Sequence, residues 1–195
     1  MRTIRNLALV FLLLPILSAA EGFMCSWQDC PPINLKTGDL VFRRGQGIWT
    51  SYFINVSSRE KRFSHVGIVV DGGDEPILIH ADADERTGYG FVHTETWCSF
   101  FINTLECAVF RYDGDPSVAS NIVVNAKRRL GVKFDSDFDM GETNRLYCSE
   151  TVRIAINEAV GTNLVGSTDV CGRKVVAIDD LYRNGFKRIY DSLGR

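Results

Sequence analysis

The sequence predicts one α+β domain, in which an antiparallel β-sheet packs against helices. Short β-rich segments separated by turn residues follow residue 35, and two helix-like segments with a short tail come after them. The length of 195 residues fits one domain better than two. With 45% hydrophobic residues the chain can bury a substantial core.

The strand-rich half begins after a turn at Leu35–Asp39, where Gly38 can adopt a positive φ. Segments rich in β-branched and aromatic residues then predict five strands: Leu40–Arg43, Ser64–Val70, Ile77–Ala81, Gly90–Thr94 and Ala108–Arg111. The turn signal at residues 71–74 makes the second and third of these a hairpin. Between the strands, we expect a helical or loop insertion at Gly45–Arg62 and a helical turn at Glu95–Asn103.

Two helices are expected in the second half. Asp115-Pro116-Ser117 is a helix start, and Gly131 ends that helix after about Leu130. The second helix spans Tyr147–Ala159, and its apolar residues predict a buried element. The remaining segments are expected to be two loops, a short helix and a final strand: Lys133–Asn144, Gly161–Gly172, Ile178–Asn184 and Phe186–Tyr190.

Residues 1–20 have the pattern of a cleavable signal peptide. Arg2 and Arg5 precede an apolar run at Leu7–Ile16, and small residues follow at 18–20. An uncleaved anchor is the alternative, although the apolar run is short for a membrane span. We therefore expect a periplasmic or secreted protein with a cysteine-containing leader at 21–34 and a folded domain at 35–195.

The charge pattern argues against a nucleic-acid-binding protein. The net charge is −2, and the basic residues form no long cluster. The sequence does not indicate an oligomeric state.

Six cysteines lie beyond residue 20, where an oxidising compartment would favour disulfides. Cys25 with Cys30, and Cys98 with Cys107, are plausible bridges. Cys148 and Cys171 remain, and a third disulfide between them is open because spacing alone does not fix connectivity. No cysteine spacing suits a structural zinc site, and only three histidines exist, so no metal or other cofactor is expected.

Cys148 is the strongest candidate for a nucleophile. It stands at the start of the second expected helix, in Tyr147-Cys148-Ser149-Glu150. Unpaired N–H groups and the helix dipole stabilise a thiolate there, so we expect a lowered thiol pKa. The same N–H groups can hold the oxyanion of a tetrahedral intermediate.

Two histidines on neighbouring expected strands suit the other roles of a catalytic triad. His65 opens one strand and can act as the general base of a thiol. His80 lies on the next strand, and cross-strand neighbours come close enough for it to orient the base. Asp82 and Glu85 are the alternatives for the orienting role. His93 is expected to be structural or at the surface.

These motifs together resemble a known family. Leu35-x-x-Gly38-Asp39-Leu40, Ser64-His65-Val66-Gly67, Gly131-x-x-Phe134-Asp135 and Tyr147-Cys148-Ser149-Glu150 are similar, in this order, to the YiiX/YebB-like group. Members of that group are NlpC-type cysteine hydrolases with a circularly permuted papain-like fold, in which the histidine strand precedes the cysteine helix. The resemblance covers about Leu35 to Tyr190.

The resemblance implies Cys148 as nucleophile, His65 as base and a contribution of Tyr147 to the oxyanion site. One position departs from the group, because its third polar residue is typically a Glu, whereas this chain has His80 there. Other NlpC-type enzymes use a His, so the expected triad is Cys148, His65 and His80. Gly38-Asp39 and Phe134-Asp135 match positions that look architectural.

The expected function is hydrolysis of an amide through an acyl-enzyme. By resemblance the substrate is a cell-wall peptide or an acylated, lipid-like envelope compound, and a peripheral membrane or lipid contact is compatible with the latter. The aromatic group Trp49, Tyr52 and Phe53 could line such a pocket or simply pack an insertion. The competing hypothesis is a non-catalytic envelope module that binds a ligand or lipid, with Cys148 held in a disulfide.

Overall fold

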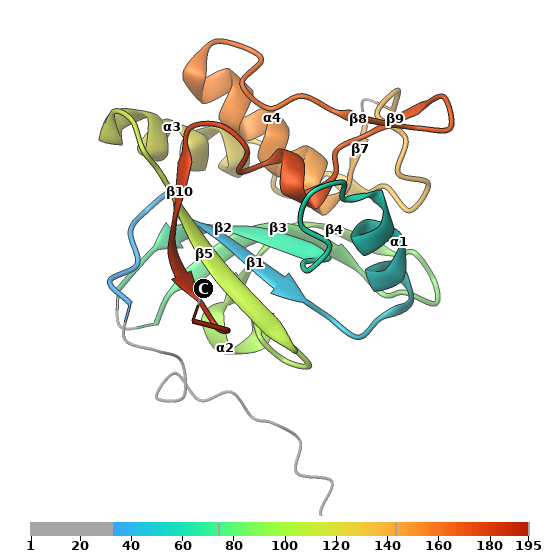
Figure 1. The fold of residues 1–195 in the computed structure, drawn as a ribbon, viewed down its shortest axis with the longest axis horizontal. Coiled ribbons are helices and arrows are strands. Elements are labelled where there is room, and N and C mark those ends of the chain that lie inside the picture. Colours follow the sequence, from blue (N-terminus) through green and yellow to red (C-terminus); the bar gives the residue numbers. More distant parts are fainter. Residues whose placement is uncertain (1–32, 74, 143, 195) are drawn as a thin grey trace, which may run out of the picture.

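The computed structural model describes residues 33–73, 75–142 and 144–194 (Figure 1). The signal-peptide prediction and nearly all of the leader lie outside these residues. One sheet contains eight strands in the order β10-β5-β1-β2-β3-β4-β6-β7. All its neighbours are antiparallel except β6 and β7, which run parallel. The α+β class predicted from the sequence is confirmed.

Six strands agree with the segments that the sequence predicts, most of them extended by one or more residues. They are β1 (Leu40–Arg44), β2 (His65–Asp71), β3 (Ile77–Ala83), β4 (Gly90–Thr96), β5 (Glu106–Tyr112) and β10 (Phe186–Asp191). The structure adds four short strands in the described part of the chain: β6 (Lys133–Phe134), β7 (Arg145–Leu146), β8 (Thr168–Val170) and β9 (Arg173–Val175). The prediction of unbroken loops over 133–144 and 161–172 is therefore wrong, because strands this short show no period in a sequence.

The helices are α1 (Ile48–Val56), α2 (Trp97–Phe100), α3 (Pro116–Lys127) and α4 (Cys148–Val160). The carboxylate of Asp115 caps α3 by accepting the N–H of Ser117 at 2.8 Å, as the sequence suggests. The helix expected over 178–184 is only a 3-10 turn, η2 (Ile178–Asp180). None of the helices in the described ranges has both the length and the apolar character needed to cross a bilayer.

The sheet separates two apolar clusters. Helices α3 and α4 cover one face, above the sheet in Figure 1, and α2 lies against the opposite face. Side chains alternate along each strand, so Leu40 and Phe42 of β1 join the cluster under α4, whereas Val41 joins the one that contains Trp97. This packing fixes the start of α4 over the middle of the sheet.

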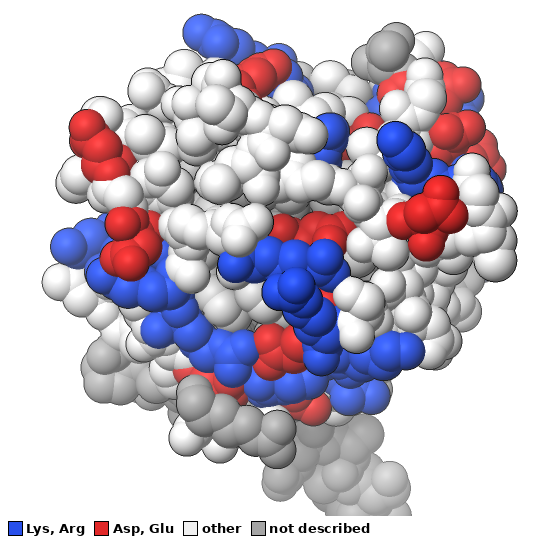
Figure 2. Space-filling view, turned by 45° about the horizontal axis from the view of Figure 1, so that its top comes forward, with Lys and Arg blue, Asp and Glu red and all other residues white. Residues whose placement is uncertain are grey.

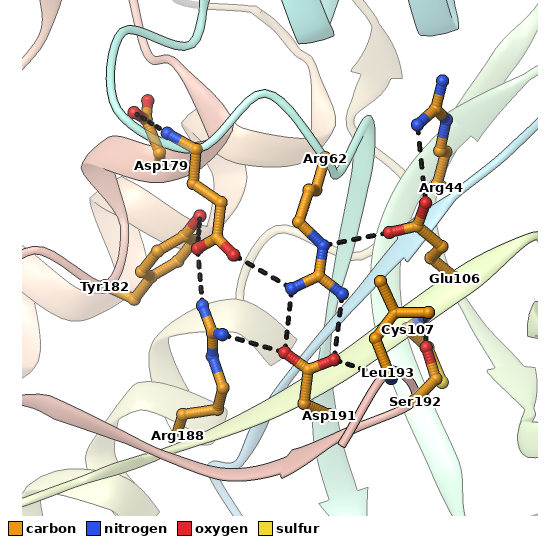
Figure 3. Close-up of polar contacts among 11 residues, drawn as sticks. Arg44, Arg62, Glu106, Cys107, Asp179, Tyr182, Arg188, Asp191, Ser192 and Leu193 are labelled. Carbon is orange, nitrogen blue, oxygen red and sulfur yellow. Dashed lines mark hydrogen bonds and ion pairs between the residues drawn. The ribbon is translucent and has the colours of Figure 1, made fainter. Parts of the chain in front are cut away.

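An ion-pair network ties the edge of the sheet to the segment after α1 (Figure 3). Arg62 donates two hydrogen bonds to Asp191 of β10, at 2.8 and 2.9 Å, and one to Glu106 of β5 at 2.9 Å. It also contacts Glu60 at 3.0 Å, and Arg188 contacts Glu60 and Asp191. The Asp191 side chain is almost fully buried, so water does not reach its carboxylate. The two arginines therefore supply the hydrogen-bond donors that this carboxylate needs.

Figure 2 shows a face on which Lys and Arg side chains gather in a band with Asp and Glu side chains among them. Above this band lies a broad area without charged residues in the same view. Positive and negative groups are thus interspersed on this face, in the manner of the Arg62 network.

Candidate active site

A cleft of about 660 Å³ lies where the first turn of α4 meets the start of β2. Both Cys148 and His65 line it, together with Arg43 of β1, Asp82 of β3 and Glu95 of β4. The strand order β1-β2-β3-β4 puts these side chains on four adjacent strands beneath one helix N-terminus. The fold therefore gathers chemically active residues from distant parts of the sequence into one cleft.

Cys148 is the first residue of α4, and two backbone N–H groups face its sulfur. They belong to Ser149, within the first turn of α4, and to Val66, which directly follows His65 on β2. The side chain of Tyr147, the N-cap residue, makes no capping hydrogen bond to this helix end. The thiol therefore lies beside the peptide that carries His65, which brings the two predicted catalytic residues together.

The expected direction of the Cys148 pKa is wrong. Burial, followed by the charge of Asp82, raises the pKa of the thiol to about 12. The N–H groups of Ser149 and Val66 and the charge of Arg43 act in the opposite direction but are outweighed. Helix position favours a thiolate, as the sequence suggests, but the residue is almost fully enclosed, so loss of hydration is the larger effect.

His65 and His80 form a buried pair. Nε2 of His65 lies 2.9 Å from Nδ1 of His80, and the ring planes are nearly perpendicular at 87°. Burial is the first cause that lowers the pKa of each ring. The charge of Arg43 lowers the pKa of His65 further, whereas the contact with Glu95 offsets part of the effect on His80. Both imidazoles are therefore neutral at physiological pH.

Glu95 extends this pair to a chain of three side chains. Its Oε2 lies 3.0 Å from Nε2 of His80, a close contact in which the N–H is not well aligned with the oxygen. Burial alone would raise the pKa of Glu95, but the contacts with His80, His93 and Arg43 outweigh it and leave the pKa below its ordinary value. Glu95 is thus an ionised acceptor at the outer end of the chain His65–His80–Glu95.

The two alternative orienting residues have other contacts. Asp82 lines the cleft and lies 3.8 Å from Arg43, whereas Glu85 accepts the N–H of Ile48 at the start of α1 at 2.8 Å. His80, the first choice from the sequence, has the direct hydrogen bond to His65.

Tyr147 has a structural contact in place of the expected role in the oxyanion site. Its side chain is fully buried, and its hydroxyl accepts the N–H of Val176 at 2.8 Å. It does not belong to the lining of the cleft. This position fixes the segment before η2 against the start of α4.

Two residues of the site, Glu95 and Arg43, were not predicted from the sequence. Both are cross-strand neighbours of the predicted histidines: His80 pairs with His93, which makes Glu95 its diagonal neighbour, and Arg43 pairs directly with His65. Arg43 lies within an expected strand, so a known register would have found it, whereas Glu95 lies just beyond the expected strand Gly90–Thr94. The sequence instead suggested that Glu95 begins a helical turn.

The cysteine pairings expected from spacing are absent among the described residues. Cys148 and Cys171 are both free thiols, Cys171 being exposed at the β8–β9 turn. Cys98 of α2 and Cys107 of β5 do not form a disulfide with each other either. The proposed partners Cys25 and Cys30 lie outside the described residues.

The aromatic insertion contributes to both the cleft and the core. Trp49 and Phe53 line the cleft, and Trp49 stacks on Phe134 with ring centroids 5.2 Å apart. Tyr52 stacks instead on Phe138 at 5.0 Å. The two interpretations of this group, pocket lining and packing, thus both apply.

Three side chains could hold a metal ion, two that line the cleft and the buried His80 behind them. One ligand atom each of His65, His80 and Asp82 lies within 4.8 Å of the others. Two imidazoles and a carboxylate are a donor set that suits zinc and other divalent transition metals. A metal bound through Nε2 of His65 or Nδ1 of His80 would displace the hydrogen bond between the two imidazoles.

Comparisons with known proteins agree with this architecture. The model of the family "Permuted papain-like amidase enzyme, YaeF/YiiX, C92 family" matches residues 34–185. A crystal structure of the metalloprotein YiiX from Escherichia coli O157:H7 superposes with a TM-score of 0.66 at 18% identity, over 81% of this chain and 98% of that one. No curated protein sequence matches. The chain belongs to the permuted papain-like amidase family of YaeF and YiiX.

Proposed function

We propose that this protein is a thiol hydrolase that cleaves an amide through an acyl-enzyme on Cys148, with His65 as general base and His80 as its orienting residue. Family membership supports an amidase in general. The observation that carries the assignment of residues is the contact of the Cys148 sulfur with the N–H of Val66, beside a His65 ring that is hydrogen-bonded to His80.

The polar chain suggests where the protons lie. Ionised Glu95 can only accept, so Nε2 of His80 carries the proton and Nδ1 of His80 is an acceptor. Nε2 of His65 then donates to His80, which leaves the lone pair of His65 Nδ1 for the thiol proton. The His80–Glu95 pair holds this tautomer and stabilises the imidazolium that forms during attack.

Because burial disfavours charge on both partners, the reaction starts from a neutral thiol and a neutral imidazole. His65 removes the thiol proton as the sulfur attacks the amide carbon, and backbone N–H groups at the start of α4 receive the negative oxygen. The imidazolium then protonates the leaving amine. Water, activated by the same imidazole, releases the acid and restores the thiol.

We propose amides of the cell envelope as substrates, either cell-wall peptides or acylated compounds. The cleft volume suits a short peptide or one acyl chain, and its rim includes Trp49 and the exposed Ile102. Export through the pattern in residues 1–20 would deliver the enzyme to such substrates. N-terminal sequencing of the exported protein tests this, with a first residue at Glu21 as the expected result.

An activated ester tests the chemistry without knowledge of the substrate. With p-nitrophenyl acetate, we expect a burst of p-nitrophenolate, an acetyl group mapped to Cys148 by mass spectrometry, and slow turnover. Cys148→Ser should abolish the burst, and His65→Ala should slow acylation by about 100-fold or more.

The matched control is Cys171→Ala, which removes an exposed thiol and should leave the burst unchanged. Acetylation confined to Cys171 would contradict the proposal. It would favour the competing hypothesis of a non-catalytic envelope module.

A second candidate is a metal-binding protein. The cluster of His65, His80 and Asp82 favours it, and the structural neighbour is described as a metalloprotein. Calorimetric titration of the folded protein with Zn²⁺ tests it, with His80→Ala and Asp82→Asn expected to weaken binding at least tenfold. Since the metal would occupy the nitrogens of the base, bound Zn²⁺ should also suppress acylation of Cys148.

A further inference from the structure

Arg43 has a position in the cleft that the proposed mechanism does not use. It pairs directly with His65 in the antiparallel register of β1 and β2, so the two side chains leave the same face of the sheet. Its side chain is only 16% exposed and lines the cleft with Cys148. The guanidinium carbon lies 5.0 Å from the centre of the Phe100 ring, which supports one face of the group.

The guanidinium of Arg43 has N–H donors that are not used in hydrogen bonds. Its Nε is buried and has no hydrogen-bond partner among the described residues. The ion pair with Asp82 is long, 3.8 Å between Nη2 and Oδ2, and exceeds hydrogen-bond distance. By contrast, Arg111 donates to both oxygens of Asp39 at 2.7 Å. A buried guanidinium without such a partner is expensive to leave unmatched.

Three carboxylates, those of Asp82, Glu95 and Glu85, act on Arg43 through their charge, but none of them accepts a hydrogen bond from it. Burial is the main cause that lowers the pKa of Arg43, and Asp82 and Glu95 offset part of this effect. The group keeps its positive charge because its ordinary pKa is above 12. Glu95 is already in contact with His80, so it does not serve as the fork-to-fork partner that a guanidinium prefers.

We propose that Arg43 is a specificity-determining residue that binds a free carboxylate of the substrate, a few bonds from the scissile amide. This inference rests on the proposed function and narrows its substrate class. An amide whose acyl or amine half carries a carboxylate, as in γ-glutamyl and diamino-acid peptides, supplies the acceptors that Arg43 lacks. An uncharged acyl amide leaves the buried guanidinium unmatched and is the poorer substrate.

Two alkylating reagents of nearly equal size measure this preference at the thiol itself. Iodoacetate carries a carboxylate and iodoacetamide a neutral amide, and both consume the same thiolate. The ratio of their rates at Cys148 therefore cancels any change in the thiol pKa. Exposed Cys171, mapped in the same digest, gives the ratio for an ordinary thiol of this chain.

We expect the iodoacetate-to-iodoacetamide ratio at Cys148 to exceed that at Cys171 by tenfold or more. Arg43→Gln should bring it down to the Cys171 value, whereas Arg43→Lys, which keeps the charge without the fork, should retain part of the preference. The matched control is Arg44→Gln, which removes the positive charge of the next residue. Arg44 lies outside the cleft and pairs with Glu106. Arg44→Gln should leave the ratio unchanged.

A matched ligand pair extends the test to a substrate-like compound. The γ-methylamide of N-acetyl-glutamate and its α-carboxamide analogue differ only in one carboxylate, and neither compound has another. The acid should protect Cys148 from iodoacetamide at a concentration at least tenfold lower than the amide, and this difference should vanish in Arg43→Gln.

A ratio at Cys148 that does not exceed the Cys171 ratio, or that is equal in the wild type and Arg43→Gln, overturns the inference. The burst with p-nitrophenyl acetate separates that failure from a failure of the proposed function, because the ester carries no carboxylate. A Cys148 that shows no burst and reacts with neither reagent overturns both.

Discussion

Nε2 of His65, which lines the cleft, is hydrogen-bonded at 2.9 Å to Nδ1 of the fully buried His80 on the neighbouring strand. The bond uses the ring nitrogen of His65 that would otherwise compete for the thiol proton. It therefore selects one tautomer of the base, and Glu95 selects the tautomer of His80.

Removal of His80 should impair acylation more than it impairs folding. We expect His80→Ala to lower the acylation rate with p-nitrophenyl acetate by about 100-fold, because His65 then has no partner that fixes its tautomer. Glu95→Gln should lower the rate by about tenfold, because the tautomer of His80 is then no longer fixed. Stopped-flow release of p-nitrophenolate measures this. His93→Ala, which removes the imidazole packed 4.4 Å from His80, is the control and should stay within about twofold. Equal losses of acylation rate in His80→Ala and His93→Ala would contradict the role of His80 in the chain His65–His80–Glu95.

Asp82 should control the ionisation of the nucleophile. Its charge is the second cause, after burial, of the raised pKa of Cys148. Asp82→Asn should therefore lower the pKa of the thiol and accelerate alkylation by iodoacetamide at pH 8.5, whereas Arg43→Gln should slow it. The midpoint near 12 lies above the usable pH range, so the ratio of the variant rate to the wild-type rate at each pH between 6 and 10 measures the shift of the thiol pKa. Glu85→Gln, which removes another carboxylate of the cleft, should match the wild type. An unchanged alkylation rate in Asp82→Asn would refute the assignment.

Glu150 should make stability decrease with pH. Burial, followed by the charge of Asp135, raises the pKa of this carboxyl from 4.5 to about 8, and its Oε2 has no partner in the described structure. A carboxyl with a raised folded-state pKa binds its proton more tightly in the folded state. The stability that it contributes is complete below about pH 4.5 and is lost as pH rises to 8.

Thermal melts of Glu150→Gln should therefore lack this loss and exceed the wild-type melting temperature at pH 8 by several degrees. Glu158→Gln, at an exposed position of α4, is the control and should follow the wild-type profile. A wild-type melting temperature that stays level from pH 4.5 to 8 argues against a buried neutral Glu150.

Asp191 should have the opposite dependence. Hydrogen bonds from Arg62 are the first cause that lowers its pKa from 3.8 to about 2. The stability that it contributes is therefore present above pH 4 and is lost as pH falls towards 2. Asp191→Asn should lower the urea midpoint at pH 7, and the gap to the wild type should close by pH 2. Asp113→Asn breaks the exposed pair with Lys187 and should have little effect at either pH.

Most of the sheet follows from the sequence, because its long strands combine β-branched residues with clear turns. Ser64–Val70 and Ile77–Ala81 are examples, and both appear as β2 and β3. The pairing of β6 with β7 does not follow, since it joins segments of two residues through long-range contacts. Helix starts are better defined, as Asp115 demonstrates, because a cap is a local feature.

The sequence predicts only those site residues that stand out by residue type or by their position at a helix start. Cys148 and the two histidines stand out for their chemistry, but Arg43 and Glu95 depend on strand register, which single strands do not specify. The direction of the Cys148 pKa depends on enclosure by distant segments, such as β2 and the cleft wall. A local motif contains no information on that enclosure.

The contact of Cys148 with the Val66 peptide joins two segments that are far apart in the chain. Contacts of this kind form late, because the entropy of closing the intervening chain has to be overcome first. The histidine hairpin can assemble from neighbouring strands, but it stays without its nucleophile until α4 docks on the sheet. During refolding, the time at which Cys148 becomes able to be acylated would therefore measure when α4 docks on the sheet. The formation of the strands alone does not reveal this step.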